Sequence, residues 1–423
     1  MNSFFTGLSG LNAQSSSINV IADNLANVNT VGFKGSTARF ADLVSGGTRS
    51  RAGNPQQEGL GVTVNAVTPT LKQGVLQTTG RPLDIALDGS GFFSALDENG
   101  GAVFTRAGDF LLGEQGNLTT SSGYSVLGWQ TAAADGAIPA SGPVSPIAIP
   151  TDLSDPQKST SSLGVSLNLD GEMATGESFA APVEIFDSLG ARHLLTLNFT
   201  KTGTLTWDYD VSIDGGELTG GTLGVPQSIA SGTLAFGGDG KLDPATGVDG
   251  AAPAPITVST PTTFLNGATG VNLTWDVLDT NSESRLTAFA APSVVSTVDQ
   301  NGFAAGNLTD LQVDSNGVIR GRFSNGRSFE LARIAIASFS NEAGLQRLGG
   351  NSFATTRSSG EAIFGSPGEG GRGQLLGGAL EMSNVDIAEQ FTSLILAQRG
   401  YQASSRVITT SDEVTQEAIN MKR

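Results

Sequence analysis

Residue types that usually carry catalysis are sparse in this 423-residue chain. There is no cysteine, and the single histidine, His193, lies in an alternating run typical of a β-strand. A lone imidazole forms neither a catalytic dyad nor a metal cluster without carboxylates brought from elsewhere in the chain. No Gly-x-Ser-x-Gly sequence precedes a helical pattern, so a serine nucleophile has no support. The sequence therefore predicts a protein that is not an enzyme.

Two glycine-rich stretches have the composition, but not the spacing, of ligand-binding loops. In Asp239–Asp243, Lys241 and the following Pro244 stand where a calcium loop of the EF-hand type needs a ligand and a glycine. Gly237–Lys241 lacks the spacing and the following Ser or Thr of a phosphate-binding P-loop. Both stretches are typical of hairpin turns. We expect no metal, no cofactor and no catalytic residue.

A different pattern occupies the two ends of the chain. Apolar residues there recur at steps of three and four, interrupted by polar residues, which puts them in one narrow stripe along a helix. Such a stripe is marginal alone, because helix nucleation is costly and most helical stability comes from packing. We predict a helix over residues 6–28 and another at the C-terminus, both made for association. The first stripe is Phe4, Leu8, Leu11, Ile18, Ala22 and Leu25, with Ser15 as its polar gap. The second is Ile387, Phe391, Leu394, Tyr401, Ile408 and Ile419, with gaps at Gln398, Ser405, Asp412 and Thr415.

Charge and composition limit the possible partners. The formal charge of −17 disfavours nucleic acid and anionic membrane surfaces, because both require clustered Lys and Arg. No apolar run reaches the length of about 18 residues that spans a bilayer. The N-terminus lacks the pattern of a signal peptide, so we expect any secretion to proceed without a cleaved leader. A chain without cysteine also suits passage, unfolded, from a reducing to an oxidising compartment.

Between the ends, short β-type runs alternate with Gly, Asn and Asp turns. We predict a mainly β protein with α-helical termini and nested, discontinuous domains. The terminal helices are expected to form a coiled-coil layer, around which lie an inner β-domain made of two segments and an inserted, β-barrel-like outer domain. The expected boundaries are 1–30 with 380–423 for the helical domain, 31–80 for an extended linker, 81–148 with 301–379 for the inner β-domain, and 149–300 for the insertion.

Blocks of sequence at both ends and in the middle resemble one bacterial family, in matching order over the whole length. The N-terminal signature of flagellar rod and hook proteins is similar to Leu8–Leu11, Asp23–Asn27 and Thr30–Lys34. Their shared domain is similar to Gly91–Phe93, Thr105–Gly108, Gly116–Leu118 and Gly123–Trp129. Their C-terminal signature is similar to Leu380–Asp386 and Ala397–Ala403, although Ser404 stands where Asn is usual. The outer domain of the hook members is similar to Val183–Gly190, His193–Lys201 and Thr206–Asp208.

The resemblance implies a structural subunit that polymerises with copies of itself into the flagellar hook, a curved tube that joins motor to filament. It implies export through the flagellar type III apparatus and an extracellular place in the hook. It further implies contacts with the distal rod protein, the hook cap and the hook–filament junction protein. In such a polymer the terminal helices line the inner tube and the insertion forms the outer surface.

The same resemblance turns the end stripes into a candidate polymer interface. Asn24 and Asn27 have two interpretations: they cap the first helix, or they bond neighbouring subunits or the turn that follows. Gln398 and Ser405 are either surface positions or polar contacts that set the register between subunits. The candidate interface residues are Leu8, Leu11, Ile18, Asn24, Leu25, Asn27, Phe391, Leu394, Gln398, Tyr401, Ser405 and Ile408.

Two alternative functions stay open at this point. A distal rod subunit of the flagellum would share the end signatures, but rod members are shorter and lack a comparable insertion. A secreted adhesin or glycan-binding β-protein would account for the acidic, strand-rich middle. It would leave the matched helical ends unexplained.

Overall fold

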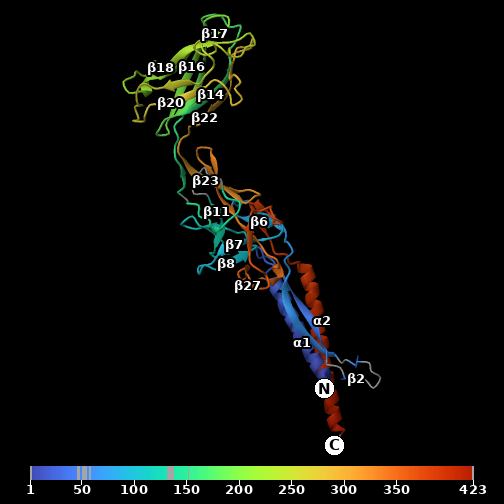
Figure 1. The fold of residues 1–423 in the computed structure, drawn as a ribbon. Helices are drawn as coiled ribbons and strands as arrows, with labels where there is room; N and C mark the ends of the chain where they lie inside the picture. The colour runs from blue at the N-terminus through green and yellow to red at the C-terminus, as the bar shows by residue number, and fades with distance from the viewer. Residues whose placement is uncertain are drawn as a thin grey trace. The chain divides into compact units, whose positions relative to one another are not determined.

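The protein is mainly β, with one α-helix near each end (Figure 1). The computed structural model describes residues 2–44, 48–49, 55–56, 59–130, 138–150 and 152–421. Helix α1 (Asn2–Ala26) begins earlier than predicted, and helix α2 (Ile387–Asn420) occupies most of the predicted C-terminal segment. The predicted class, mainly β with helical termini, is therefore confirmed.

Local chemistry sets the inner ends of both helices. The α1 helix gives way to a turn that runs to Gly32, which has a φ of +66°. A side chain there would be strained, and its Cβ would stand 2.4 Å from the backbone nitrogen of Ala107. Helix α2 begins after Asp386, whose carboxylate accepts from the amides of Ala388 and Glu389 at 2.8 and 3.1 Å. This is an N-cap, which satisfies amides that lack partners inside the helix.

The chain divides into two compact units, each built from more than one segment. Unit 1 comprises residues 1–151, 309–322 and 328–423, and unit 2 comprises 152–308 and 323–327. Unit 2 is thus inserted into the sequence of unit 1. Strand β23 (Gly306–Val313) carries the chain from unit 2 back into unit 1.

Unit 1 interleaves early and late strands. In antiparallel pairs, β7 joins β26, β8 joins β28, β11 joins β25 and β6 joins β30. The early strands are β5 (Leu76–Thr78), β6 (Ile85–Asp88), β7 (Phe92–Leu96), β8 (Ala102–Thr105), β9 (Leu111–Leu112), β10 (Leu118–Thr119), β11 (Ser125–Gln130) and β12 (Ser145–Pro146). The late strands are β24 (Val318–Phe323), β25 (Ser328–Ile334), β26 (Ile336–Ser338), β27 (Gln346–Gly349), β28 (Ser352–Ala354), β29 (Ile363–Gly365), β30 (Gln374–Gly377) and β31 (Ala379–Glu381).

Aromatic rings fill a core between these early and late strands. The buried ring of Phe92 packs edge-on against Phe353 with centroids 5.6 Å apart, and Phe104 packs against Phe339 at 4.8 Å. Each fully buried side chain of this size stabilises the fold by roughly 1.5–3 kcal/mol. Because Phe92 and Phe104 come from one segment and Phe353 from another, neither segment completes this core alone.

The segment predicted as an extended linker contains a long antiparallel strand pair. Strands β1 (Ser36–Val44) and β4 (Gly59–Pro69) pair from Ser36–Pro69 to Val44–Gly59. The pair packs against α1: the hydroxyl of Ser9 accepts from the amide of Val62 at 3.2 Å. Two short strands, β2 (Thr48–Arg49) and β3 (Pro55–Gln56), also pair in this segment.

Unit 2 has a single large core shared by two sheets. One sheet is the antiparallel series β15 (Ser178–Phe186), β16 (Arg192–Lys201), β17 (Thr206–Asp214) and β18 (Pro226–Ala235). The other contains β14 (Ser162–Asn168), β19 (Ile256–Ser259), β20 (Asn272–Asp276), β21 (Leu286–Thr287) and β22 (Val294–Gln300). Alternate residues of both sheets point into the core, where Trp207 and Trp275 are fully buried. The short strand β13 (Ser154–Asp155) pairs with β23.

The predicted barrel-like closure of the insertion is wrong. Among the described residues, strands β14 to β22 form two separate sheets, and β14 pairs in parallel with β20 and β21. A parallel pair joins strands that are distant in sequence, and nothing in the alternating pattern of either strand announces its partner.

A buried carboxylate organises one end of unit 2. The Asp187 side chain is fully buried and accepts from the amides of Leu189 and Ala191, at 2.8 and 2.9 Å. It also accepts from the amide of Asn266 at 2.6 Å and faces Nε2 of His193 at 3.0 Å. Burial raises the pKa of Asp187, but these hydrogen bonds outweigh burial and hold the pKa below its usual value of 3.8.

This lowered pKa gives unit 2 an acid-sensitive component of stability. Asp187 contributes fully above pH 3.8, and its contribution is lost as pH falls below 3.8 through the lower pKa of the folded state. Asp187→Asn should cost about 1–3 kcal/mol at pH 7, and the difference from the parent chain should shrink in acid. Urea unfolding followed by the fluorescence of Trp207 and Trp275 measures both values. A difference that stayed constant from pH 7 to pH 2.5 would contradict this assignment.

Candidate assembly site at the chain ends

Helices α1 and α2 run antiparallel and meet through small residues. A Cβ added to Gly7 would stand 3.0 Å from Cγ1 of Ile408, and one added to Gly10 would stand 3.0 Å from Oγ of Ser404. Further along, a Cβ on Gly400 would stand 3.0 Å from Cδ of Gln14. Ala13 and Ala397 are buried in the same region. The absence of larger side chains at these glycines lets the two backbones approach closely.

Ser404, the departure from the usual signature, lies in this narrow contact. Its hydroxyl and Cβ would be 3.0 and 3.7 Å from a Cβ on Gly10, so the two helices leave little room there. A serine fills that space with few atoms. The substitution therefore concerns the pairing of α1 with α2 inside one chain.

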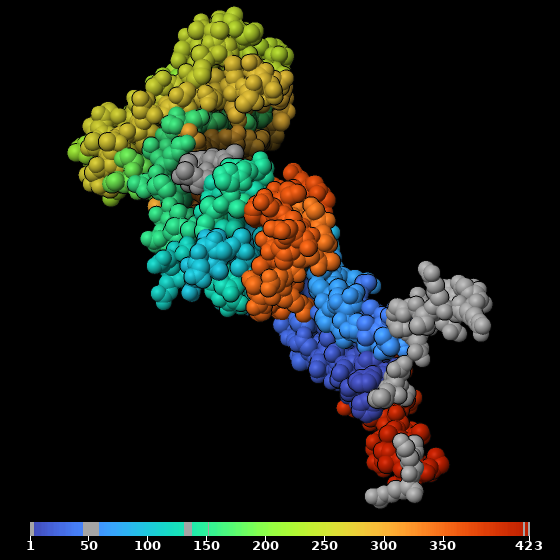
Figure 2. All heavy atoms as spheres, turned by 60° about the horizontal axis from the view of Figure 1, so that its bottom comes forward, coloured from blue at the N-terminus to red at the C-terminus, as the bar shows by residue number. Residues whose placement is uncertain are grey.

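Packing through small residues leaves the large apolar side chains of both helices in solvent. Phe5 is 61% exposed and Leu396 is 64% exposed. Figures 1 and 2 show that the C-terminal end of α2 extends beyond the start of α1, so its last apolar residues have no helix opposite them. Other exposed apolar residues on the two helices are Phe4, Leu8, Ile387, Phe391, Ile395, Tyr401, Val407, Val414 and Ile419.

The structure separates the predicted interface residues by exposure. Leu8, Phe391, Gln398 and Tyr401 are exposed, and Asn24 is buried. The half-buried members are Leu11, Ile18, Leu25, Asn27, Leu394, Ser405 and Ile408. The side chain of Ile408 packs over Gly7 of α1 in the same chain.

Asn24 fastens α1 to the strand that follows it. Its amide nitrogen donates to the carbonyl of Ser36 at 2.8 Å, and its oxygen accepts from the Ser36 amide at the same distance. The same nitrogen lies 3.1 Å from Oε1 of Gln390 on α2. Asn27 bonds back to Asp23 of α1 and lines a pocket of about 270 Å³ with Phe33 and others. Asn24 therefore makes its hydrogen bonds within its own chain.

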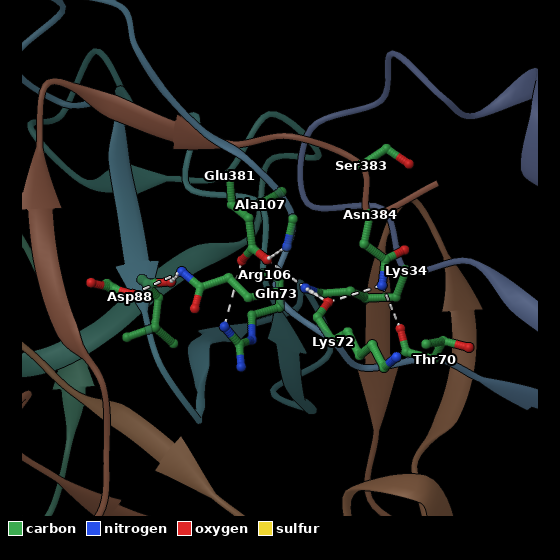
Figure 3. A network of polar contacts seen from close by, with 12 residues as sticks. Lys34, Thr70, Lys72, Gln73, Asp88, Arg106, Ala107, Glu381, Ser383 and Asn384 are labelled. Carbon is green, nitrogen blue, oxygen red and sulfur yellow. Dashed lines mark hydrogen bonds and ion pairs between the residues drawn. The ribbon is translucent and has the colours of Figure 1, made fainter. Parts of the chain in front are cut away.

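Beyond the helices, a buried ionic network joins three distant parts of the chain (Figure 3). Nζ of Lys34 lies 2.5 Å from Oε1 of Glu381, and neither side chain is exposed. The second oxygen of Glu381 faces Nη1 of Arg106 at 3.5 Å. One carboxylate therefore neutralises two cations, one from the turn after α1 and one from the end of β8.

Backbone groups complete the network. The Glu381 carboxylate also accepts from the amide of Gly74 at 2.8 Å, and the Lys34 ammonium donates to the carbonyl of Lys72 at 2.9 Å. Asn384 accepts from the amide of Gly35 at 2.8 Å and donates to the carbonyls of Thr70 and Lys72 at 2.7 and 2.9 Å. Segments near residues 34, 72 and 382 are thereby held together just before α2 begins.

The charged groups of this network are shielded from water, and this burial shifts the pKa values of its two cations. Burial lowers the pKa of Lys34, and the charge and hydrogen bond of Glu381 oppose that effect. Burial likewise lowers the pKa of Arg106, again opposed by Glu381. Removing one member of a buried ion pair leaves an uncompensated charge, which is far more costly than losing an exposed pair.

Sequence reasoning missed these charged residues as a site. Lys34, Arg106 and Glu381 each lie inside a block that carries the family resemblance: Thr30–Lys34, Thr105–Gly108 and Leu380–Asp386. The available signal was a charged residue within a short motif that is otherwise mostly apolar, small or neutral. Opposite charges in separate motifs could have suggested a meeting point, although no spacing rule links residues 34, 106 and 381.

Neither a metal cluster nor a membrane-spanning helix occurs among the described residues. Among them, no group of three or more His, Asp or Glu side chains is arranged to hold a metal ion. Neither described helix combines the length and apolar character needed to cross a bilayer.

Charge balance predicts unequal effects within the network. Glu381→Gln leaves two buried cations without a counter-charge and should cost about 3–5 kcal/mol of unfolding free energy. Lys34→Met leaves Glu381 paired with Arg106 and should cost less. Urea unfolding followed by the fluorescence of Trp129, in chains where Trp207 and Trp275 of unit 2 are replaced by Phe, measures both. Arg320→Met, which removes an exposed pair with Glu330, serves as control and should cost under about 1 kcal/mol. A larger loss for Lys34→Met than for Glu381→Gln would contradict the arrangement.

Comparison with family models matches four stretches of the chain. Residues 4–34 match "Flagella basal body rod protein" and 86–173 match "Flagellar hook protein FlgE/F/G D1 domain". Residues 159–303 match "Flagellar basal body protein FlaE D2 domain", and 376–421 match "Flagellar basal body rod FlgEFG protein C-terminal". The two end matches contain the small-residue contacts between α1 and α2.

Whole-length relatives agree with these matches. The flagellar hook protein FlgE of Escherichia coli K12 is 33% identical over 99% of this chain and 100% of its own length. That of Borreliella burgdorferi is 33% identical over the full length of both chains. The fold is similar to the crystal structure of Helicobacter pylori flagellar hook protein FlgE2, with a TM-score of 0.54 and 17% identity over 72% of this chain and 100% of that one. This chain belongs to the flagellar hook protein family, a family of structural subunits.

Proposed function

We propose that this chain polymerises into the hook through the apolar side chains that α1 and α2 leave exposed. The observation that supports the proposal is the way the two helices pair. Glycine, alanine and serine lie at the contact together with Ile408, and large apolar residues such as Phe5 and Leu396 stay mostly exposed within the subunit. An exposed apolar surface of this kind marks a contact with another molecule.

The same packing makes the helix pair dependent on assembly. Contacts between small residues bury little apolar area, and buried apolar area supplies most of the stability of a helix pair. Neighbouring subunits would cover the exposed side chains and add the missing area. Both stripes would then be completed between chains, with Gln398 as a polar contact that sets the register.

We infer a layered subunit from the order of the segments. The terminal helices would line the tube, the β-strands of unit 1 would form a second shell, and the inserted unit 2 would face outward. Bending would arise from sliding between β-domains of adjacent subunits, while torque passes along the helices. The outward faces of β16 and β17 are mostly polar, with Thr and Asp as the commonest residues, and such faces are suited to contacts that slip.

Partners follow from the place of such a subunit in the flagellum. We propose end-to-end contact with the distal rod protein on one side and the hook–filament junction protein on the other, with growth beneath the hook cap. Export would use the flagellar type III apparatus. The lack of cysteine supports that route, because an unfolded chain without thiols forms no wrong disulfides on reaching an oxidising compartment.

A charge placed on the exposed helix face should block assembly without unfolding the subunit. Leu396→Glu changes a side chain that is 64% exposed, so its effect on unfolding should stay within about 0.5 kcal/mol. If Leu396 is buried between subunits, losing that burial should cost about 2 kcal/mol per contact and raise the critical concentration for polymerisation about 30-fold. Sedimentation of the polymer measures this concentration.

The matched control is Leu265→Glu, at a position 67% exposed in unit 2. It should polymerise at the concentration of the parent chain, because we place no inner-tube contact there. Equal critical concentrations for Leu396→Glu and the parent would contradict the proposed interface.

Removing the insertion tests the layered arrangement. Lys158 and Phe303 exchange two backbone hydrogen bonds, of 3.0 and 2.8 Å, so the ends left by excising residues 159–302 already lie side by side. Joined by a two-residue turn, the shortened chain should still polymerise, and electron microscopy should show tubes of altered curvature. Complete loss of polymers from a shortened chain that remains folded would contradict the model.

A further inference from the structure

The single histidine of the chain occupies a position that the assembly site does not use. His193 is on β16 of unit 2, nearly buried, with its ring stacked on Phe264 at a centroid distance of 3.8 Å and an interplanar angle of 21°. Both ring nitrogens face a carboxylate oxygen. Nε2 lies 3.0 Å from Oδ2 of Asp187, and Nδ1 lies 2.5 Å from Oε2 of Glu217.

The contact with Asp187 determines whether Nε2 of His193 carries a proton. Asp187 already accepts hydrogen bonds from two backbone amides and from Asn266, and its pKa lies below the usual value because these bonds outweigh its burial. An ionised carboxylate can only accept. Nε2 of His193 therefore carries a hydrogen and donates it to Asp187.

The contact with Glu217 requires a proton on Nδ1 of His193 as well. With that proton present, the ring donates from both nitrogens and Nδ1 binds the Glu217 carboxylate. Without it, the lone pair of Nδ1 would face an ionised oxygen at 2.5 Å, which is repulsive. Because the Glu217 side chain is 36% exposed, it can turn into water instead.

We propose that His193 and Glu217 form a one-proton latch on the loop between β17 and β18, closed when Nδ1 is protonated and open when it is not. Glu217 ends the short 3₁₀ helix η1 (Gly215–Glu217) that starts this loop. Its carbonyl accepts from the amide of Leu265 at 2.9 Å, which ties the loop to the neighbouring turn. Further along, the loop carries Leu223, which is 81% exposed. The latch concerns unit 2 alone and goes beyond the proposed polymerisation.

Other charged groups on the adjoining strands do not provide a second switch of this kind. Glu184 on β15 and Arg192 on β16 pair with each other on the exposed sheet face, opposite to the side on which His193 lies. Asp214, the N-cap of η1, accepts from the amides of Gly216 and Gly224. The neighbouring turn contributes Phe264 and Asn266, which carry no charge.

A spin label on the loop tests the latch in the full chain. Because the protein has no cysteine, Leu223→Cys gives one labelling site, and the nitroxide line shape reports loop mobility from pH 5.5 to 8.5. The chemical shifts of the lone imidazole, measured over the same range, report its protonation. The label should pass from restricted to mobile at the pH where the imidazole loses its proton.

Two substitutions of Glu217 test the proposed role of its side chain. In Glu217→Gln, the side-chain amide can accept from a protonated Nδ1 or donate to an unprotonated one, so the label should stay restricted throughout. In Glu217→Ala, the label should be mobile throughout. The matched control Glu184→Gln removes an exposed carboxylate from the neighbouring strand and should keep the transition of the parent. The latch is overturned if the parent shows no mobility transition, or if Glu217→Gln retains it, or if Glu184→Gln loses it.

Discussion

One carboxylate, Glu381, lies between two buried cations and fixes where the two chain ends leave the β-core. Lys34 follows α1, Arg106 belongs to the β-core, and Glu381 precedes α2. The two helices can meet only if both chain ends leave the β-core at the same place. The buried charge network holds the two ends together there. Any arrangement that separated its members would leave a buried charge without a partner, which is costly. Asn384 and Asn24 extend the fastening to the strands that follow α1.

The small residues at the contact determine which side chains of α1 and α2 stay exposed. Gly7, Gly10 and Gly400 let α1 and α2 approach closely while burying little apolar surface. The large apolar residues are thereby left for other contacts. A pair with leucine at the same positions would be more stable alone and would have less to gain from a neighbour. We propose that the weakness of the pair links folding of the ends to assembly.

Sequence patterns predicted the mainly β class and both helices, because end stripes and strand runs are local signals. They did not predict which residues bring the helices together. Heptad reasoning favours large apolar side chains such as Leu8 and Phe391 at a helix contact, whereas the intrachain contact uses Gly10 and Ser404, which carry no hydrophobic signal. The Glu381 network was not predicted either, since no spacing rule links Glu381 to Lys34 and Arg106. The parallel pairing of β14 with β20 in unit 2 was not predicted either, because it leaves no mark on the sequence of either strand.

Helices α1 and α2 pair within one chain through small residues, and we propose that their remaining apolar side chains make contacts between chains. A disulfide between residues 10 and 404 tests this most directly, because the Cβ of Ser404 would lie 3.7 Å from a Cβ on Gly10, within the range that disulfides require. In the double variant Gly10→Cys/Ser404→Cys, mass spectrometry locates the bond within or between chains. We expect an intrachain bond in the subunit, and tubes that still assemble from the oxidised chains. Oxidised chains that no longer assemble, or tubes in which the bond joins different chains, would contradict it.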